Sequence, residues 1–151
     1  DPVIFEEKIR GYRNFINKIW NASRFVLMNS TDFNPKKKPQ LSSADKKTLK
    51  DLEKTVKKIT GLMDSFKFYL AAEELYHYFW NTFADKIIEK QKNRLYGEDK
   101  KEKEASQYLL MEVLKTNLKL LHPFIPFVTE EIYQNLPEKS DYLMIDSWPG
   151  K

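Results

Sequence analysis

The sequence predicts an all-α fold, an antiparallel bundle of four long helices with a short fifth helix and an extended C-terminal tail. Apolar residues recur at steps of three and four along four long stretches, which is the helical period. The 151 residues include only 4 Gly and 7 Pro, too few for a turn-rich β-sandwich. With 41% hydrophobic residues, we expect residues 1–151 to form a single domain with its own core.

The first helix is expected from Pro2 to Met28. Proline suits the first turn of a helix, and Pro35 and Pro39 prevent the helix from continuing through the next loop. The stripe predicted to face the core comprises Phe5, Ile9, Tyr12, Ile16, Ile19, Ser23 and Val26. Trp20 lies at the margin of this stripe, and we predict a structural role for it.

The second helix is expected to start at Ser42 or Ser43. Ser42 and Asp45 stand three residues apart, which resembles a capping box with Asp in place of Glu. One apolar stripe follows, comprising Leu49, Leu52, Val56, Ile59 and Met63. The other positions are mostly charged or polar, so this helix is predicted to cover one side of the core.

The third helix is expected over residues 68–95 and is predicted to be the central helix of the bundle. Its apolar band is wide and rich in aromatic rings: Leu75, Tyr76, Phe79, Trp80, Phe83, Ile87 and Ile88. Within this band, Phe79 and Trp80 are predicted to be structural. Gly97 is expected to end the helix in a left-handed conformation, and the charged run 98–104 is expected to be a loop or a frayed turn.

The fourth helix is expected over residues 105–121, because the residue before Pro123 disfavours helical backbone. Its predicted core positions are Leu109, Leu110, Val113, Leu114, Leu118 and Leu121. Pro126 is expected to open a short fifth helix that ends near Leu136. Residues 142–148 are predicted to be an extended tail with apolar anchors.

The residue content excludes most site chemistry. There is no Cys, which excludes disulfides, zinc–thiolate sites and Cys nucleophiles. No acidic residue stands at helical spacing from both His77 and His122, so no metal site is predicted. A glycine-rich phosphate loop and a serine nucleophile motif are also missing, so we predict no catalytic residue and no enzyme activity for this chain alone. No apolar run approaches the roughly 20 residues that span a bilayer, so no membrane partner is expected.

One face of the first helix differs from an ordinary solvated surface. At about 100° per residue, polar side chains gather on the side opposite the apolar stripe, with no acid between Arg10 and Met28 and with Phe25 roughly 150° from the centre of the stripe. The face comprises Arg10, Asn14, Asn17, Lys18, Asn21, Phe25 and Met28, with Arg13 and Arg24 at its edge. Amides hydrogen-bond base edges, cations hold phosphates and a ring stacks on an unpaired base, so this chemistry suits single-stranded RNA. The same residues also fit an alternative interpretation, in which this face is an ordinary solvated surface and Phe25 packs beneath the following loop.

Two other basic patches allow phosphate contacts. One closes the third helix and consists of Lys86, Lys90, Lys92, Asn93 and Arg94. Cations at a helix C-terminus are also expected from the helix dipole alone. The other patch is the run of Lys36, Lys37 and Lys38 in the first loop, which serves equally well as a solvated surface. The net charge of +4 permits a polyanionic partner without requiring one.

Several segments resemble the anticodon-binding domain of valyl-tRNA synthetases. Residues 11–26, Gly-Tyr-Arg-Asn-Phe-Ile-Asn-Lys-Ile-Trp-Asn-Ala-Ser-Arg-Phe-Val, resemble the first helix of that domain, and residues 71–85 resemble its third helix. Residues 120–132 resemble a segment shared by the valyl, isoleucyl and leucyl branch, and Ser147-Trp148-Pro149 also fits. The stretch 17–21 resembles the valyl members in particular. Together these matches cover nearly the whole chain.

The resemblance implies that this domain grips the anticodon stem and loop of valine tRNA. It implies that the first helix faces the anticodon. Combined with the polar face, it predicts the tRNA-binding residues Asn14, Asn17, Lys18, Asn21, Arg24 and Phe25.

The resemblance also implies a second part of the enzyme. A separate catalytic domain is expected to perform aminoacylation in the cytoplasm and to bind ATP and Mg²⁺, whereas no cofactor is expected in this chain. The His-x-Gly-His and Lys-Met-Ser-Lys-Ser signatures of that catalytic domain do not occur in this sequence. Two alternatives stay open: an isoleucyl-tRNA synthetase anticodon-binding domain and a helical protein-interaction module.

Overall fold

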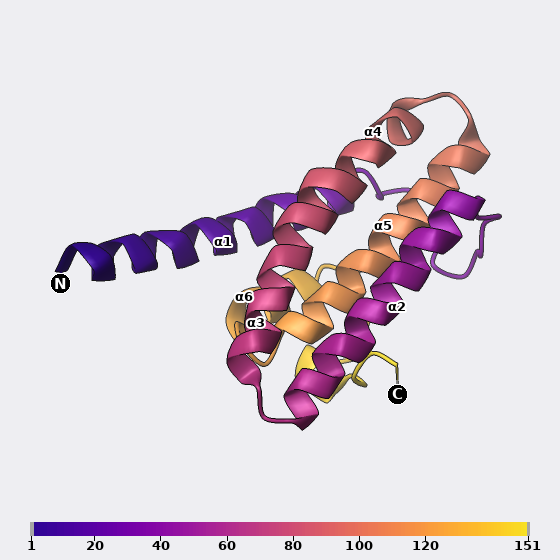
Figure 1. The fold of residues 1–151 in the computed structure, drawn as a ribbon. Helices are drawn as coiled ribbons and strands as arrows, with labels where there is room; N and C mark the ends of the chain where they lie inside the picture. The colour runs from indigo at the N-terminus through magenta and orange to yellow at the C-terminus, as the bar shows by residue number, and fades with distance from the viewer. Residues whose placement is uncertain (1, 151) are drawn as a thin grey trace.

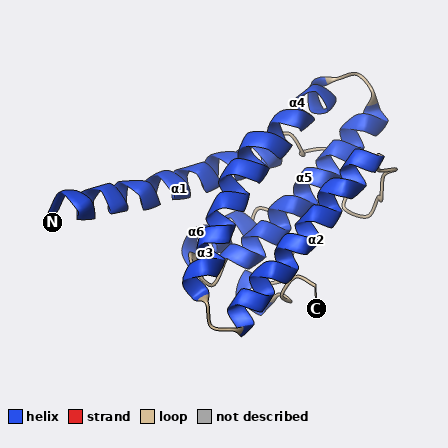
Figure 2. Ribbon diagram, viewed as in Figure 1, coloured by secondary structure: helices blue, strands red, loops and turns tan. Residues whose placement is uncertain are grey.

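The computed structural model describes residues 2–150, with side chains described from residue 7 onward. All regular secondary structure in this range is helical (Figure 2). The elements are α1 (Pro2–Met28), α2 (Ser43–Asp64), α3 (Phe68–His77), η1 (Tyr78–Ile87), α4 (Ile88–Tyr96), α5 (Lys100–Leu121), α6 (Pro126–Tyr133) and η2 (Leu143–Ile145). Segments α3, η1 and α4 follow one another without a break, with η1 wound as a π-helix. The predicted all-α bundle of four long helices, a short fifth helix and a tail is therefore confirmed (Figure 1).

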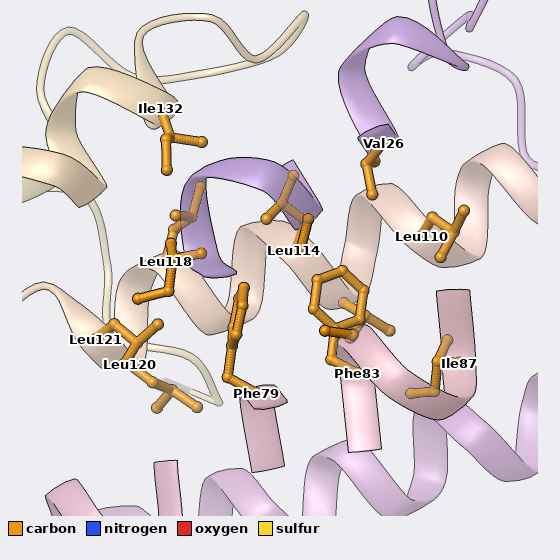
Figure 3. Close-up of a cluster of buried hydrophobic side chains, with 14 of the residues drawn as sticks. Val26, Phe79, Phe83, Ile87, Leu110, Leu114, Leu118, Leu120, Leu121 and Ile132 are labelled. Carbon is orange, nitrogen blue, oxygen red and sulfur yellow. The ribbon is translucent and has the colours of Figure 1, made fainter. Parts of the chain in front are cut away.

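Helix α5 lies at the centre of the bundle. It contacts α1, α2, α3, η1, α4 and α6, and 12 of its 22 residues are buried. Figure 3 shows its leucines packed among side chains of α1, η1 and α6; those labelled include Leu110, Leu114, Leu118, Val26, Phe79, Phe83 and Ile132. The prediction that the third helix is central is wrong, because that helix keeps an outer side open to solvent, where Tyr76 and Asn81 are exposed.

Only the C-terminal half of α1 enters the bundle (Figure 1). Its buried apolar side chains are Phe15, Ile19, Ala22 and Val26. Ile9, Tyr12 and Ile16 are predicted to face the core, but they are exposed. Ile9 and Tyr12 precede the turns that pack against the core, and Ile16 lies within those turns but is 39% exposed beside the buried Phe15. The side chain of Phe5 lies outside the described residues.

The start of α2 confirms the predicted capping box. The hydroxyl oxygen of Ser42 accepts a hydrogen bond from the backbone N–H of Asp45, and the Asp45 carboxylate accepts one from the backbone N–H of Ser42 at 3.0 Å. The buried apolar side of α2 consists of Leu52, Val56 and Ile59, with Leu49 and Met63 packed at its edges. Helix α2 therefore covers one side of the core, as its stripe predicts.

The connection between α4 and α5 is shorter than predicted. Gly97 has extended backbone, with φ −76° and ψ 168°, so the prediction of a left-handed terminator is wrong. Helix α5 begins at Lys100 because the Asp99 carboxylate caps it, accepting from the backbone N–H groups of Lys101 and Glu102. The predicted loop over residues 98–104 is therefore mostly helix.

The C-terminal tail is held against the bundle. The Tyr133 hydroxyl donates to Asp146 at 2.6 Å, and the Trp148 indole N–H donates to the Thr60 hydroxyl at 2.9 Å. Leu143 is buried in the short helix η2, which interrupts the extended backbone. The predicted anchors are confirmed, whereas α6 ends at Tyr133 and not near Leu136.

Candidate RNA-binding face of α1

The exposed side of α1 carries a row of polar side chains. Asn14, Asn17, Asn21 and Arg24 are all exposed, and their spacing of three and four places them on one side of the helix. We call these four residues the polar strip. Within the described residues, none of the four side chains forms a hydrogen bond or a salt bridge. Three amides and one guanidinium are therefore available to a ligand.

Lys18 borders the polar strip but is already engaged. Its Nζ lies 2.6 Å from Oδ1 of Asp85 and 5.4 Å from the centroid of the Trp80 ring. Both partners belong to η1, which packs beside α1. Asp85 places an acidic group at the edge of a face that is free of acids along its own helix. A phosphate bound by Lys18 therefore competes with Asp85.

Phe25 is half-buried and packs against the core. The prediction that it lies opposite the core is wrong, because the third helix packs along the flank of α1. Lys92 of α4 lies over the ring, with its Nζ 5.6 Å from the ring centroid. This contact brings the basic patch at the end of the third helix next to the face of α1, two features that sequence spacing treats as separate.

Trp20 is 43% exposed, so it lacks the full burial on which a large structural contribution depends. Phe79 is fully buried and Trp80 is half-buried against the core, in agreement with the prediction for these two rings. Trp20 and Arg24 line one wall of a groove of about 330 Å³ between α1 and α6. The other lining residues are Ser23, Leu27, Met28, Glu131, Ile132 and Asn135.

Residues 45–151 match the family model described as the anticodon-binding domain of tRNA ligase. This chain belongs to that family. The valine–tRNA ligase of Carboxydothermus hydrogenoformans is 44% identical over 145 residues, which are 95% of this chain and 16% of that protein. The valine–tRNA ligase of Pseudothermotoga lettingae is also 44% identical, over 99% of this chain and 17% of that protein.

The chain thus spans about a sixth of the length of these curated relatives. The family model begins at residue 45, in α2, and so does not include α1. The relatives nevertheless align over 95% and 99% of the chain, so most of α1 has a counterpart in them. The similarity to valine–tRNA ligases therefore includes the helix that carries the polar strip.

Arg94 of this anticodon-binding domain forms hydrogen bonds within the fold. Its guanidinium forms two hydrogen bonds to the carboxylate of Asp45, at 2.7 and 3.0 Å, and a third to Glu102 at 2.6 Å. Burial by itself raises the pKa of Asp45, but hydrogen bonds from Arg94 and Ser42 outweigh it and hold the pKa below its usual value. Arg94 thereby joins α2, α4 and α5, so it is not a free cation of the predicted basic patch.

The remaining basic side chains divide between paired and solvated ones. Lys92 also pairs with Glu89 at 2.7 Å, and Lys37 pairs with Glu104 at 2.5 Å. Lys86 and Lys90 are exposed on the third helix.

No described group of three or more His, Asp or Glu side chains is arranged to hold a metal ion. None of the helices described combines the length and apolar character needed to cross a membrane.

Proposed function

We propose that this chain is the part of a valine–tRNA ligase that binds the anticodon stem and loop of valine tRNA. The observation that carries the proposal is the polar strip of α1, which presents unpaired amides and a guanidinium on a domain of the anticodon-binding family. Asn14, Asn17 and Asn21 can donate to and accept from the edges of unpaired bases. Arg24 supplies a phosphate contact. The valine specificity comes from the names of the relatives.

Lys18 and Lys92 flank the polar strip, and each is paired with an acid, Asp85 and Glu89 respectively. Phe25 lies between the strip and Lys92, and its half-buried ring offers limited room for stacking on a base. In this proposal, Lys18 exchanges Asp85 for a phosphate when the tRNA binds. Aminoacylation belongs to the remaining part of the ligase, where ATP and Mg²⁺ are expected to bind, and the working compartment is the cytoplasm.

A binding titration tests the proposal. The 151-residue chain is titrated with fluorescent anticodon stem-loops of valine tRNA and isoleucine tRNA, for the wild type and for the Asn17→Ala, Asn21→Ala double variant. Loss of two base contacts is expected to weaken binding of the valine stem-loop by about 2 kcal/mol or more. The matched control replaces Asn34, an exposed amide in the loop after α1, by Ala and is expected to bind normally.

Equal binding by the wild type and the double variant contradicts the polar strip as the binding face. Preference for the isoleucine stem-loop favours the isoleucyl alternative. Binding of neither stem-loop at low salt favours a protein-interaction module.

A further inference from the structure

Four apolar side chains form an exposed ridge along α1. Ile9 is 50% exposed, Tyr12 69%, Ile16 39% and Trp20 43%. Spacings of three and four residues place them on one side of the helix, along about 16 Å of its axis. The projecting half of α1 (Figure 1) carries Ile9 and Tyr12, whereas Ile16 and Trp20 belong to the half that enters the bundle.

The apolar ridge runs into the groove between α1 and α6, since Trp20 belongs to both. Leu27 and Ile132 contribute apolar walls to this groove. The Ser23 hydroxyl beside them is buried and has no hydrogen-bond partner among the described residues.

The aliphatic half of the ridge suits protein and not RNA. The side chains of Ile9 and Ile16 have neither a ring for stacking nor a group that forms hydrogen bonds, and both features dominate RNA recognition. Aliphatic and aromatic side chains at helical spacing are typical of helix packing against another protein surface. The polar strip lies on a neighbouring side of the same helix, so a protein on the ridge leaves Asn14, Asn17 and Asn21 open, whereas Arg24 also lines the groove.

We infer that the apolar ridge and the groove dock against the remaining polypeptide of the same ligase. This inference rests on the proposed function, and the relatives hold about five sixths of their length outside the matched region. A second copy of the chain fits less well, because a specific interface buries about 800 Å² per partner and one helical ridge of four side chains supplies less. A covalently attached surface is present at an effective concentration of about 1 mM, so a smaller contact suffices. Helix α1 thereby connects the tRNA-binding face to the rest of the enzyme.

Cysteine accessibility tests the inference. The chain has no Cys, so Tyr12→Cys introduces a single thiol whose alkylation rate is measured by mass spectrometry. The same substitution is made in the full-length ligase, and the labelled peptide is followed there. Alkylation is expected to be about tenfold slower, or more, in the full-length protein, because burial protects a thiol. Trp20→Cys provides a second site, and thermal melting verifies that each variant is folded.

Asn14→Cys is the matched control on the polar strip. It is expected to react at equal rates in the chain and in the full-length ligase, and to slow only when valine tRNA is added. If tRNA does not change the alkylation rate of Asn14→Cys while both ridge variants are protected in the ligase, the proposed RNA face is wrong and the inference stands.

Three results would each overturn the inference. The first is that both ridge variants react equally fast in the chain and in the ligase. The second is protection that occurs only when tRNA is added, which would make the ridge an RNA surface. The third is protection in the isolated chain as its concentration rises, which would make the partner a second copy.

Discussion

Helices α5 and α1 differ in how they use their surface. Helix α5 is surrounded by other helices and has apolar side chains on several sides. Helix α1 is longer, at 27 residues, yet among its side chains described from residue 7 onward the buried apolar ones lie only between Phe15 and Val26. The stability of the domain is therefore concentrated in α5, whereas α1 keeps a polar side and an apolar side available for partners.

The largest expected difference between the two helices is the loss of stability when an apolar side chain is truncated to Ala. Leu114→Ala in α5 is expected to lower the free energy of unfolding by about 2–5 kcal/mol, because it leaves a cavity in a fully buried site. Ile16→Ala in α1 is expected to change it by less than about 0.5 kcal/mol. Denaturant titration of both variants of the isolated chain measures the difference. A similar loss for both means that the exposed side of α1 contributes to the fold.

The second prediction concerns the ion pair between Asp45 of α2 and Arg94 of α4. Asp45→Asn is expected to cost about 1–3 kcal/mol at neutral pH, since Arg94 then keeps a partly buried charge without a full partner. The folded-state pKa of Asp45 is lowered, so its contribution is present above the unfolded-state pKa and is lost as the pH falls through the folded-state pKa. Thermal melting from pH 7 to pH 2 should therefore show a smaller loss of stability in acid for Asp45→Asn than for the wild type. Parallel pH curves for the two proteins exclude this role of Asp45.

The third prediction separates two aromatic residues of α1, Phe25 and Trp20. Phe25→Ala is expected to cost about 1–2 kcal/mol of stability, because a half-buried ring loses part of its contact with the core. Trp20→Ala, the control on the exposed side, is expected to stay within about 0.5 kcal/mol of the wild type. Melting of the isolated chain measures both. The reverse order of the two costs contradicts the described packing of α1.

The smallest expected effect is electrostatic. Arg24→Gln is expected to lower the slope of log affinity against log salt for the valine stem-loop by about 0.7–0.9, the contribution of one phosphate contact. Lys50→Gln, an equal loss of charge at an exposed position of α2, is expected to leave the slope unchanged. Titrations at several salt concentrations measure both slopes. An equal drop in slope for the two variants indicates a general effect of net charge and no contact at Arg24.

The helices themselves follow from local patterns. Helical periodicity predicts their number and type, and short-range chemistry predicts several of their ends, such as the Ser42 capping box and the stop before Pro123. Apolar periodicity does not predict the start of α5, because the cap at Asp99 lies within a run of charged residues that has no apolar pattern. The sequence alone also shows the resemblance to anticodon-binding domains, because continuous segments carry it.

The surroundings of the candidate site depend on contacts between distant segments. The exposed amides of the polar strip follow from the period of α1, but Lys18 meets Asp85 across 67 residues of sequence, and Lys92 reaches the ring of Phe25 from α4. Periodicity defines an apolar side of a helix without specifying whether a neighbour covers it. Ile9, Tyr12 and Ile16 therefore read as core in sequence and are exposed in the fold, because burial depends on where the other helices end in space.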